Sequence, residues 1–167
     1  MAKKILIVIV ALVLIIAMGG WLAYYFSDKE VIKRQLTGLA VELGKEGQES
    51  PIQMALKMGN VKKMLAKGCL VTIPEKGYSE VLEQDLIIQY LIYHRNRFAL
   101  FTVAFEDVIV DIPVKGQATV QSRVRLRRQN TAQIESVEES HQVEIALIQS
   151  DKKWLFHKVT MPESLVE

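Results

Sequence analysis

The sequence has too few cysteines for a cysteine-based site and too little net charge for a nucleic-acid-binding surface. It contains one cysteine in 167 residues, which excludes an intrachain disulfide framework, a cysteine-based zinc site and a two-cysteine redox centre. The formal net charge is +2, and residues 28–167 carry 19 basic and 19 acidic side chains. Nucleic-acid binding depends on clustered Lys and Arg that displace counterions from phosphates. We therefore expect no nucleic-acid partner.

Common catalytic and cofactor motifs are missing as well. The sequence contains no GxGxxG, no GxxxxGK[ST], no HExxH and no GxSxG, so it indicates no dinucleotide site, P-loop, zinc protease helix or nucleophile elbow. The spacing of His94, His141 and His157 suggests no metal site. We expect no cofactor and no bound metal, and the absence of a catalytic motif favours a non-enzymatic role.

One long hydrophobic segment is present near the N-terminus. Residues 5–26 are 22 consecutive residues without a charged side chain, and at 1.5 Å per residue such a helix is roughly 33 Å long, enough for a bilayer core of ~30 Å. Aromatic residues suited to the headgroup level lie at its end, namely Trp21, Tyr24 and Tyr25. We expect an uncleaved single-pass anchor that binds the bilayer. The alternative is a signal peptide cleaved after about residue 19.

The chain divides into four parts around this anchor. Residues 1–4 form a short basic tail, 5–26 the anchor, 28–162 one domain and 163–167 a C-terminal tail. A short basic N-terminus favours the cytoplasm, and long C-terminal domains cross the membrane largely regardless of their charge. We expect a cell-membrane protein with an extracytoplasmic domain, which in a bacterium would be periplasmic.

Three helices are expected in the domain. Each begins at a serine able to accept a hydrogen bond from the first helical turn, namely Ser27, Ser50 and Ser79. The first helix is expected to end at Gly44 and the second at Gly68. The third contains residues 86–93, which are apolar nearly all round, and such a helix is covered on most sides.

The remaining elements are strands. Residues 69–73 read as a short buried strand before the third helix, and after Arg97 the hydrophobic period changes from 3.6 to 2. Long strands are expected at residues 100–113, 118–127, 141–147 and 154–161, with a bulge at Glu106–Asp107 in the first of them. The fold class is α+β: a curved antiparallel sheet of about four long strands plus a short one, with three helices on one face.

This order of elements resembles the nuclear transport factor 2-like superfamily, which includes ketosteroid isomerase and the SnoaL-like proteins. The resemblance covers residues 28–162 and rests on the strand CLVTI, the meander FEDVIVDIPVKGQATVQSRVRL and the closing SDKKWLFHKVTM. It implies a cone-shaped domain whose interior can be hollow. Isomerase and cyclase members carry an acid in that pocket, whereas the short strand here has no carboxylate. No catalytic residue is therefore transferred.

Four polar side chains are candidates for the lining of such a pocket: His141, Asp85, Tyr90 and Tyr93. His141 shares an apolar strand face with Val143, and a histidine there can act as acid, base or ligand anchor. Each candidate also has a structural interpretation: a strand-end histidine, a solvated carboxylate and two core aromatics.

A basic row, Arg123, Arg125 and Arg127, lies on the outward face of its strand. It is a candidate docking strip for an acidic partner or for lipid headgroups. The structural alternative is cross-strand pairing, with Arg127 facing Glu138 and Arg123 near Glu144.

These observations lead to two hypotheses of different class. The first is a membrane-anchored, non-enzymatic interaction or scaffold protein of the cell envelope. On this hypothesis the chain binds a protein partner in the membrane or envelope, and a homodimer is a further candidate assembly. The second is a protein that binds a small apolar ligand, or an isomerase- or cyclase-like enzyme, in the conical pocket.

Overall fold

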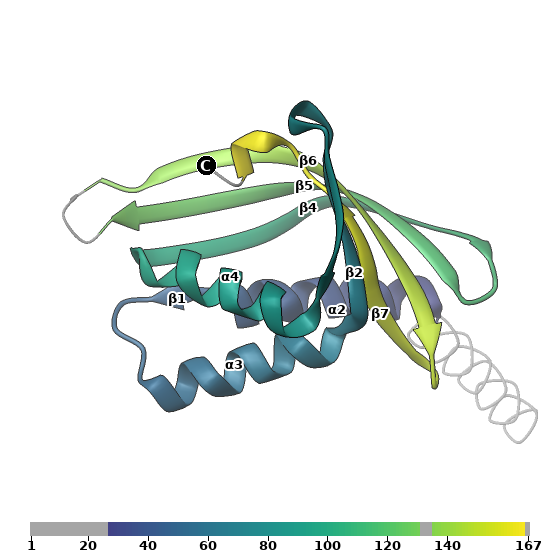
Figure 1. Cartoon of the computed structure of the whole chain (residues 1–167), viewed down its shortest axis with the longest axis horizontal. Coiled ribbons are helices and arrows are strands. Elements are labelled where there is room, and N and C mark those ends of the chain that lie inside the picture. The colour runs from purple at the N-terminus through teal and green to yellow at the C-terminus, as the bar shows by residue number, and fades with distance from the viewer. Residues whose placement is uncertain (1–26, 131–134, 166–167) are drawn as a thin grey trace, which may run out of the picture.

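A computed structural model describes residues 27–130 and 135–165. Three helices pack against one face of a strongly curved seven-stranded sheet (Figure 1). The helices are α2 (Asp28–Leu43), α3 (Pro51–Met64) and α4 (Gln84–Asn96), with short 3-10 helices η1 (Pro74–Lys76) and η2 (Glu163–Leu165). The strands are β1 (Lys45–Glu46), β2 (Leu65–Ile73), β3 (Tyr78–Glu83), β4 (Phe98–Val114), β5 (Gln117–Asn130), β6 (Val137–Ser150) and β7 (Lys153–Thr160). The α+β class and the three helices on one face are confirmed.

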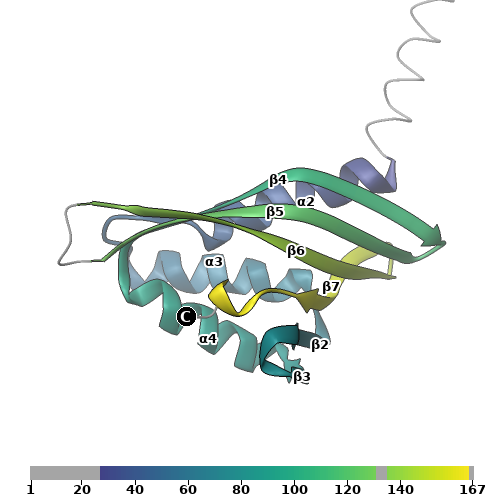
Figure 2. The ribbon, with the colours of Figure 1, turned by 90° about the horizontal axis from the view of Figure 1, so that it is seen from above.

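The sheet has the order β1-β4-β5-β6-β7-β2-β3. All neighbours are antiparallel except β2 and β7, which run parallel. The expectation of a wholly antiparallel sheet is therefore wrong at this one pair. These two strands are far apart in the chain: β2 follows α3 directly, whereas β7 comes after the long meander of β4, β5 and β6 (Figure 2).

The first two serine caps are confirmed. Ser27 accepts a hydrogen bond from the backbone N–H of Glu30, and Ser50 forms a reciprocal capping box with Gln53. These caps satisfy N–H groups that the first turn of a helix leaves without partners. Gly44 ends α2, as expected.

The third cap is wrong. Ser79 lies in β3, and α4 begins five residues later, at Gln84, without a side-chain cap. The open edge of β2 accounts for this difference, because residues 78–83 pair with β2 from Ile73 to Gly68. Ladder hydrogen bonds outweigh a capping signal that is worth about 1 kcal/mol.

The second helix ends earlier than expected, at Met64 rather than Gly68. Leu65 and Ala66 are buried as the first residues of β2. Gly68 instead allows β3 to approach closely, because a Cβ there would lie 2.9 Å from Cγ1 of Val81.

The bulge in β4 is confirmed, and it turns the strand over. The register between β4 and β5 shifts between Glu106 and Ile109, and Asp107 adopts a positive φ of 51°. Ser122 of β5 lies opposite this point, and its buried hydroxyl donates to the carbonyl oxygen of Glu106 at 2.8 Å. Odd-numbered residues such as Phe105 face the helices before the bulge, and even-numbered ones such as Val110 face them after it. This switch explains why β4 is apolar on both faces.

The expected anchor at 5–26 lies outside the described residues. Among residues 27–130 and 135–165, no helix combines the length and the apolar character that crossing a bilayer requires.

Candidate functional site

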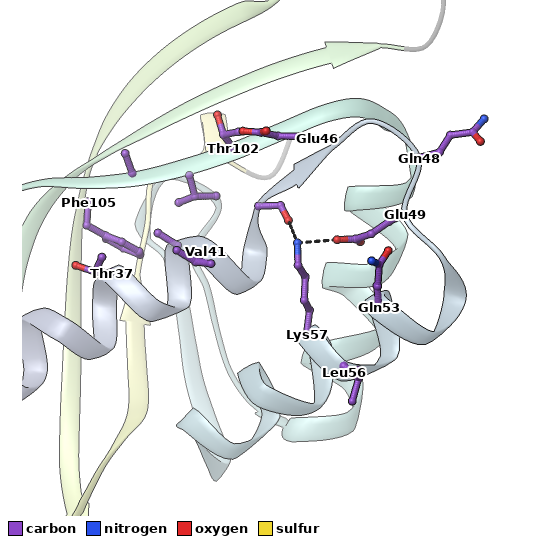
Figure 3. Close-up of a pocket in the computed structure, with 14 residues that line it drawn as sticks. Thr37, Val41, Glu46, Gln48, Glu49, Gln53, Leu56, Lys57, Thr102 and Phe105 are labelled. Atoms are coloured by element: carbon purple, nitrogen blue, oxygen red, sulfur yellow. Dashed lines mark hydrogen bonds and ion pairs between the residues drawn. The ribbon is translucent and has the colours of Figure 1, made fainter.

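An open groove of about 900 Å³ lies beside the C-terminal end of α2 (Figure 3). It lies between α2, the connection from β1 to α3, the start of α3 and the first half of β4. Its charged lining residues are Glu46, Glu49 and Lys57. Lys57 points between the carboxylate of Glu49, at 2.6 Å, and the carbonyl oxygen of Gly44, at 2.8 Å.

Arg95 of α4 lies beneath these groups, and only 1% of it is exposed. Its Nε donates to the carbonyl oxygen of Leu43, and its Nη2 donates to that of Gly44, both at 2.8 Å. The same Nη2 lies 2.9 Å from a carboxylate oxygen of Glu49. Carbonyls at the end of a helix lack intrahelical partners and carry partial negative charge. Arg95 therefore closes the end of α2 and ties it to α4.

Glu49 compensates the two cations. Burial alone would raise the pKa of Glu49, but the hydrogen bond from Lys57 and the charges of Arg95 and Lys57 outweigh it and lower that pKa. Glu49 thus stays ionised at neutral pH. Glu49, Lys57 and Arg95 are engaged in joining α2, α3 and α4, so we assign these three residues a structural role.

A second cavity lies between the concave face of the sheet and the helices, and it is partly open to solvent, since lining residues such as Leu91, Phe101 and Leu165 are only partly buried. Its volume is about 260 Å³. Helices, strands and η2 all contribute apolar side chains to its wall. The lining residues are Leu39, Leu43, Val61, Leu65, Cys69, Val71, Ile87, Leu91, Phe101, Val103, Phe105, Val124, Leu126, Val143, Ile145, Phe156, Val159, Met161 and Leu165. This lining contains no carboxylate, histidine, lysine, arginine or tyrosine, so the cavity offers an apolar surface and one thiol.

That thiol belongs to Cys69, the single cysteine of the chain. Its residue is 1% exposed, and burial raises the pKa of the thiol to about 11. A thiolate is the reactive form, and the ordinary pKa is 9.0. Cys69 is therefore a poor nucleophile at neutral pH.

We expect Cys69 to react with a small neutral thiol reagent at least about 100-fold more slowly in the native protein than in the unfolded chain, because the pKa alone lowers the thiolate fraction by that factor. Intact-mass spectrometry at pH 7.5, with and without urea, measures both rates. Equal rates would mean that the thiol is outside the apolar interior.

The four polar residues proposed for the pocket lie outside this cavity. Tyr90 and Tyr93 are 53% and 64% exposed on the outer side of α4, and the exposed carboxylate of Asp85 pairs with Lys62 of α3. His141 lines a different, shallow pocket beside η2. The cavity wall therefore contains none of the polar groups that were expected there.

The arginine row is paired on the outer face of the sheet. Arg123 lies 2.7 Å from Asp107, and Arg125 bridges Glu106 and Glu138. Arg127 is in register with Glu138, as expected, but donates to Ser136. Arg123 was expected near Glu144. In the sheet, Arg123 lies opposite Gln142, and Glu144 lies opposite Gln121, two residues further along β6. The charges of Arg123 and Arg125 are thus compensated within the domain.

A polar cluster borders the cavity, and His141 is the one member that the sequence indicated as a candidate. We call it the rim cluster: Arg128, Glu139, His141 and Ser164. Nη2 of Arg128 lies 2.6 Å from Glu139, and His141 lies 3.4 Å from Glu139 and 3.0 Å from the Ser164 hydroxyl. Strand alternation could have revealed Glu139, because it faces the same side of β6 as His141.

Comparison with solved structures supports the architecture. The domain is similar to a provisionally assigned scytalone dehydratase from Novosphingobium aromaticivorans, with a TM-score of 0.63 and 14% identity over 78% of this chain and 80% of that one. It is also similar to a cystatin-like protein from Nostoc punctiforme (TM-score 0.59, 14% identity, 81% and 90% covered) and to a protein from Cytophaga hutchinsonii described as nuclear transport factor 2-like (0.54, 14%, 80% and 92%). The fold is nuclear transport factor 2-like.

The nuclear transport factor 2-like fold is all that these similarities show, since each identity is far below the level at which a function transfers. No family model matches the sequence, and no curated protein matches it. The expected fold family is thus confirmed at the level of architecture. The function has to be argued from the cavity and its surroundings.

Proposed function

We propose that this protein is a non-enzymatic binding protein for a small apolar molecule, held in the cavity between the sheet and the helices. The observation that carries the proposal is the wholly apolar wall around about 260 Å³. An apolar cavity of ~150 Å³ stays free of water and binds benzene. A larger apolar cavity contributes a more favourable binding free energy, because a hydrocarbon group that fills it makes more van der Waals contacts and buries more apolar surface.

The same wall argues against an isomerase or cyclase. Such enzymes need a proton donor or acceptor within hydrogen-bond reach of the reacting atoms. The side chains that line the cavity provide none, and Cys69 stays protonated at neutral pH. The acid–base groups Glu139 and His141 lie beyond this lining, where they contact each other, Arg128 and Ser164. Asp85 is solvated and pairs with Lys62, so it is not available as a buried base.

The proposal includes the bilayer as a second partner, through the apolar segment at 5–26. A single-pass anchor would hold the cavity close to the membrane, where apolar molecules concentrate. On this proposal the protein is a cell-membrane protein with its domain outside the cytoplasm. The scaffold hypothesis, with its envelope protein partner and homodimer, stays a prediction.

Decanol provides a test, with Cys69 as the reporter of occupancy. We expect decanol to slow the modification of Cys69 at least about tenfold in the full chain held in phosphatidylcholine nanodiscs, because a bound alkyl chain excludes the reagent from the cavity. The variant Val143→Phe places a larger ring in the cavity wall and should abolish this protection. Intact-mass spectrometry measures the rates.

The matched control is Val137→Phe, on the same strand but 51% exposed. It should leave the protection by decanol intact. Circular dichroism establishes that both variants are folded. Protection that persists in folded Val143→Phe, or that is absent from the natural chain, would contradict the proposed function.

A further inference from the structure

The rim cluster lies at one end of the apolar cavity, as the strand register shows. Glu139 and His141 of β6 are directly opposite Leu126 and Val124 of β5, both of which line the cavity. Arg128 follows Leu126 on the same face of β5. The polar groups therefore continue the cavity wall outward along β5 and β6.

The rim cluster is more exposed than the cavity-lining residues that precede or follow it along β5 and β6. The side chains of Arg128, Glu139 and His141 are 19%, 31% and 15% exposed, whereas Leu126 and Val143 are 6% and 7% exposed. A molecule that extends from the cavity toward solvent along these strands would therefore place its outer end at these polar groups.

The third side of the rim is formed by η2. The hydroxyl of Ser164 lies 3.0 Å from Nδ1 of His141, and the next residue, Leu165, lines the cavity. This short helix belongs to the segment that was expected to be a C-terminal tail. Two adjacent residues of η2 thus belong to the two surfaces: Ser164 to the rim cluster and Leu165 to the apolar cavity wall.

Two arginines, Arg97 and Arg128, lie at this corner of the domain. The guanidinium of Arg128 lies 5.7 Å above the ring of Phe98, next to the end of α4. Burial, and after it the charges of Arg97 and Arg128, lowers the pKa of His94, which places both arginines within electrostatic range of the same group. Glu139 is the one carboxylate that contacts Arg128 among the described residues.

Arg128 retains donors for a further acceptor. Its Nη2 is committed to Glu139, but a guanidinium carries five N–H groups in a planar arrangement that suits a carboxylate. Both ring nitrogens of His141 are engaged, one with Glu139 and one with the hydroxyl of Ser164, so the ring holds these two groups in place beside Arg128.

We propose that the cavity takes a medium-chain alkyl carboxylate, with its alkyl chain within the apolar wall and its carboxylate on Arg128 at the rim cluster. This inference rests on the proposed function and names its ligand class. A cavity of about 260 Å³ is less than twice the ~150 Å³ that accommodates the six carbons of benzene, which indicates a chain of about ten carbons.

The test compares decanoate with decanol, which has the same chain and no charge. Both are titrated against the modification of Cys69 in the full chain held in phosphatidylcholine nanodiscs. The concentration that gives half-protection is corrected for the partition of each compound into the lipid. We expect this corrected concentration to be about tenfold lower for decanoate than for decanol, because charge-assisted hydrogen bonds are about twice as strong as neutral ones. In Arg128→Gln this preference should disappear while protection by decanol is retained.

Two further variants make the result specific. Arg128→Lys keeps the charge and should restore part of the preference, and Arg123→Gln, on the outer face of the same strand, should leave it unchanged. For each ligand, the partition into lipid is the same for every variant, so it cancels when variants are compared.

The outcomes separate this inference from the proposed function. Equal affinity for decanoate and decanol, or a preference that survives in Arg128→Gln, would overturn the carboxylate site and leave the apolar cavity standing. If neither compound protects Cys69, the proposed function fails and this inference fails with it.

Discussion

Replacing Arg95 by methionine should lower the free energy of unfolding by about 3 to 5 kcal/mol, which is the range observed when one partner of a buried ion pair is removed. The variant removes the hydrogen bonds to the carbonyls of Leu43 and Gly44 and leaves Glu49 with Lys57 alone. Urea denaturation measures the loss, and the melting temperature should fall by roughly 10 °C in a chain of this size.

The matched control is Arg123→Met. Arg123 also pairs with a carboxylate, that of Asp107, but its side chain is 47% exposed, and exposed pairs contribute only about 0.2–1 kcal/mol. Similar losses in the two variants would contradict the structural role of Arg95. Arg95→Lys should not restore the stability, because an ammonium group cannot reach several acceptors in the geometry of a guanidinium.

Replacing Phe156 by alanine should cost about 3 to 5 kcal/mol of unfolding free energy, the usual range for a buried phenylalanine. Phe156 is 2% exposed, pairs in register with Leu147 and forms part of the cavity wall. Its removal enlarges the cavity. The variant should therefore bind longer alkyl chains, and tetradecanol should protect Cys69 better in the variant than in the natural chain.

The neighbouring substitution Leu155→Ala provides the comparison. Leu155 lies on the same strand with its side chain toward the other face, and it is only partly buried. It should lose about 1 kcal/mol and leave the preference for chain length unchanged. A Phe156→Ala variant that loses stability but keeps the original length preference would mean that Phe156 does not bound the ligand space.

The sequence predicted those features that depend on neighbouring residues. Ser27 and Ser50 cap their helices, and the bulge lies at Glu106–Asp107, because capping and alternation are decided within a few residues. Ser79 carried the same local signal and still lies in a strand. The edge of β2 that it pairs with is set by the whole sheet, and no local pattern reports it.

The candidate site was harder to predict from the sequence for the same reason. A cavity results from incomplete filling between three helices and a curved sheet, which is a property of the packed domain and not of any one segment. Arg95 did carry a signal, since a charged residue at the end of a largely apolar helix needs partners when it is buried. Its acceptors, Leu43 and Gly44, are about fifty positions away in the chain, so the sequence could not name them.

The parallel pairing of β2 with β7 has a consequence for how the domain is made. Among the described strands, β7 alone joins β2 and β3 to the rest of the sheet, and it follows all of them in the chain. Until then, β2 and β6 each present an unpaired edge, and β2 waits through more than eighty residues of synthesis for the partner of Val71, which is Val159. Contacts so far apart in sequence slow folding. The domain therefore completes its sheet only after β7 has been synthesised, and the β2–β3 hairpin depends on other protection from aggregation during that interval.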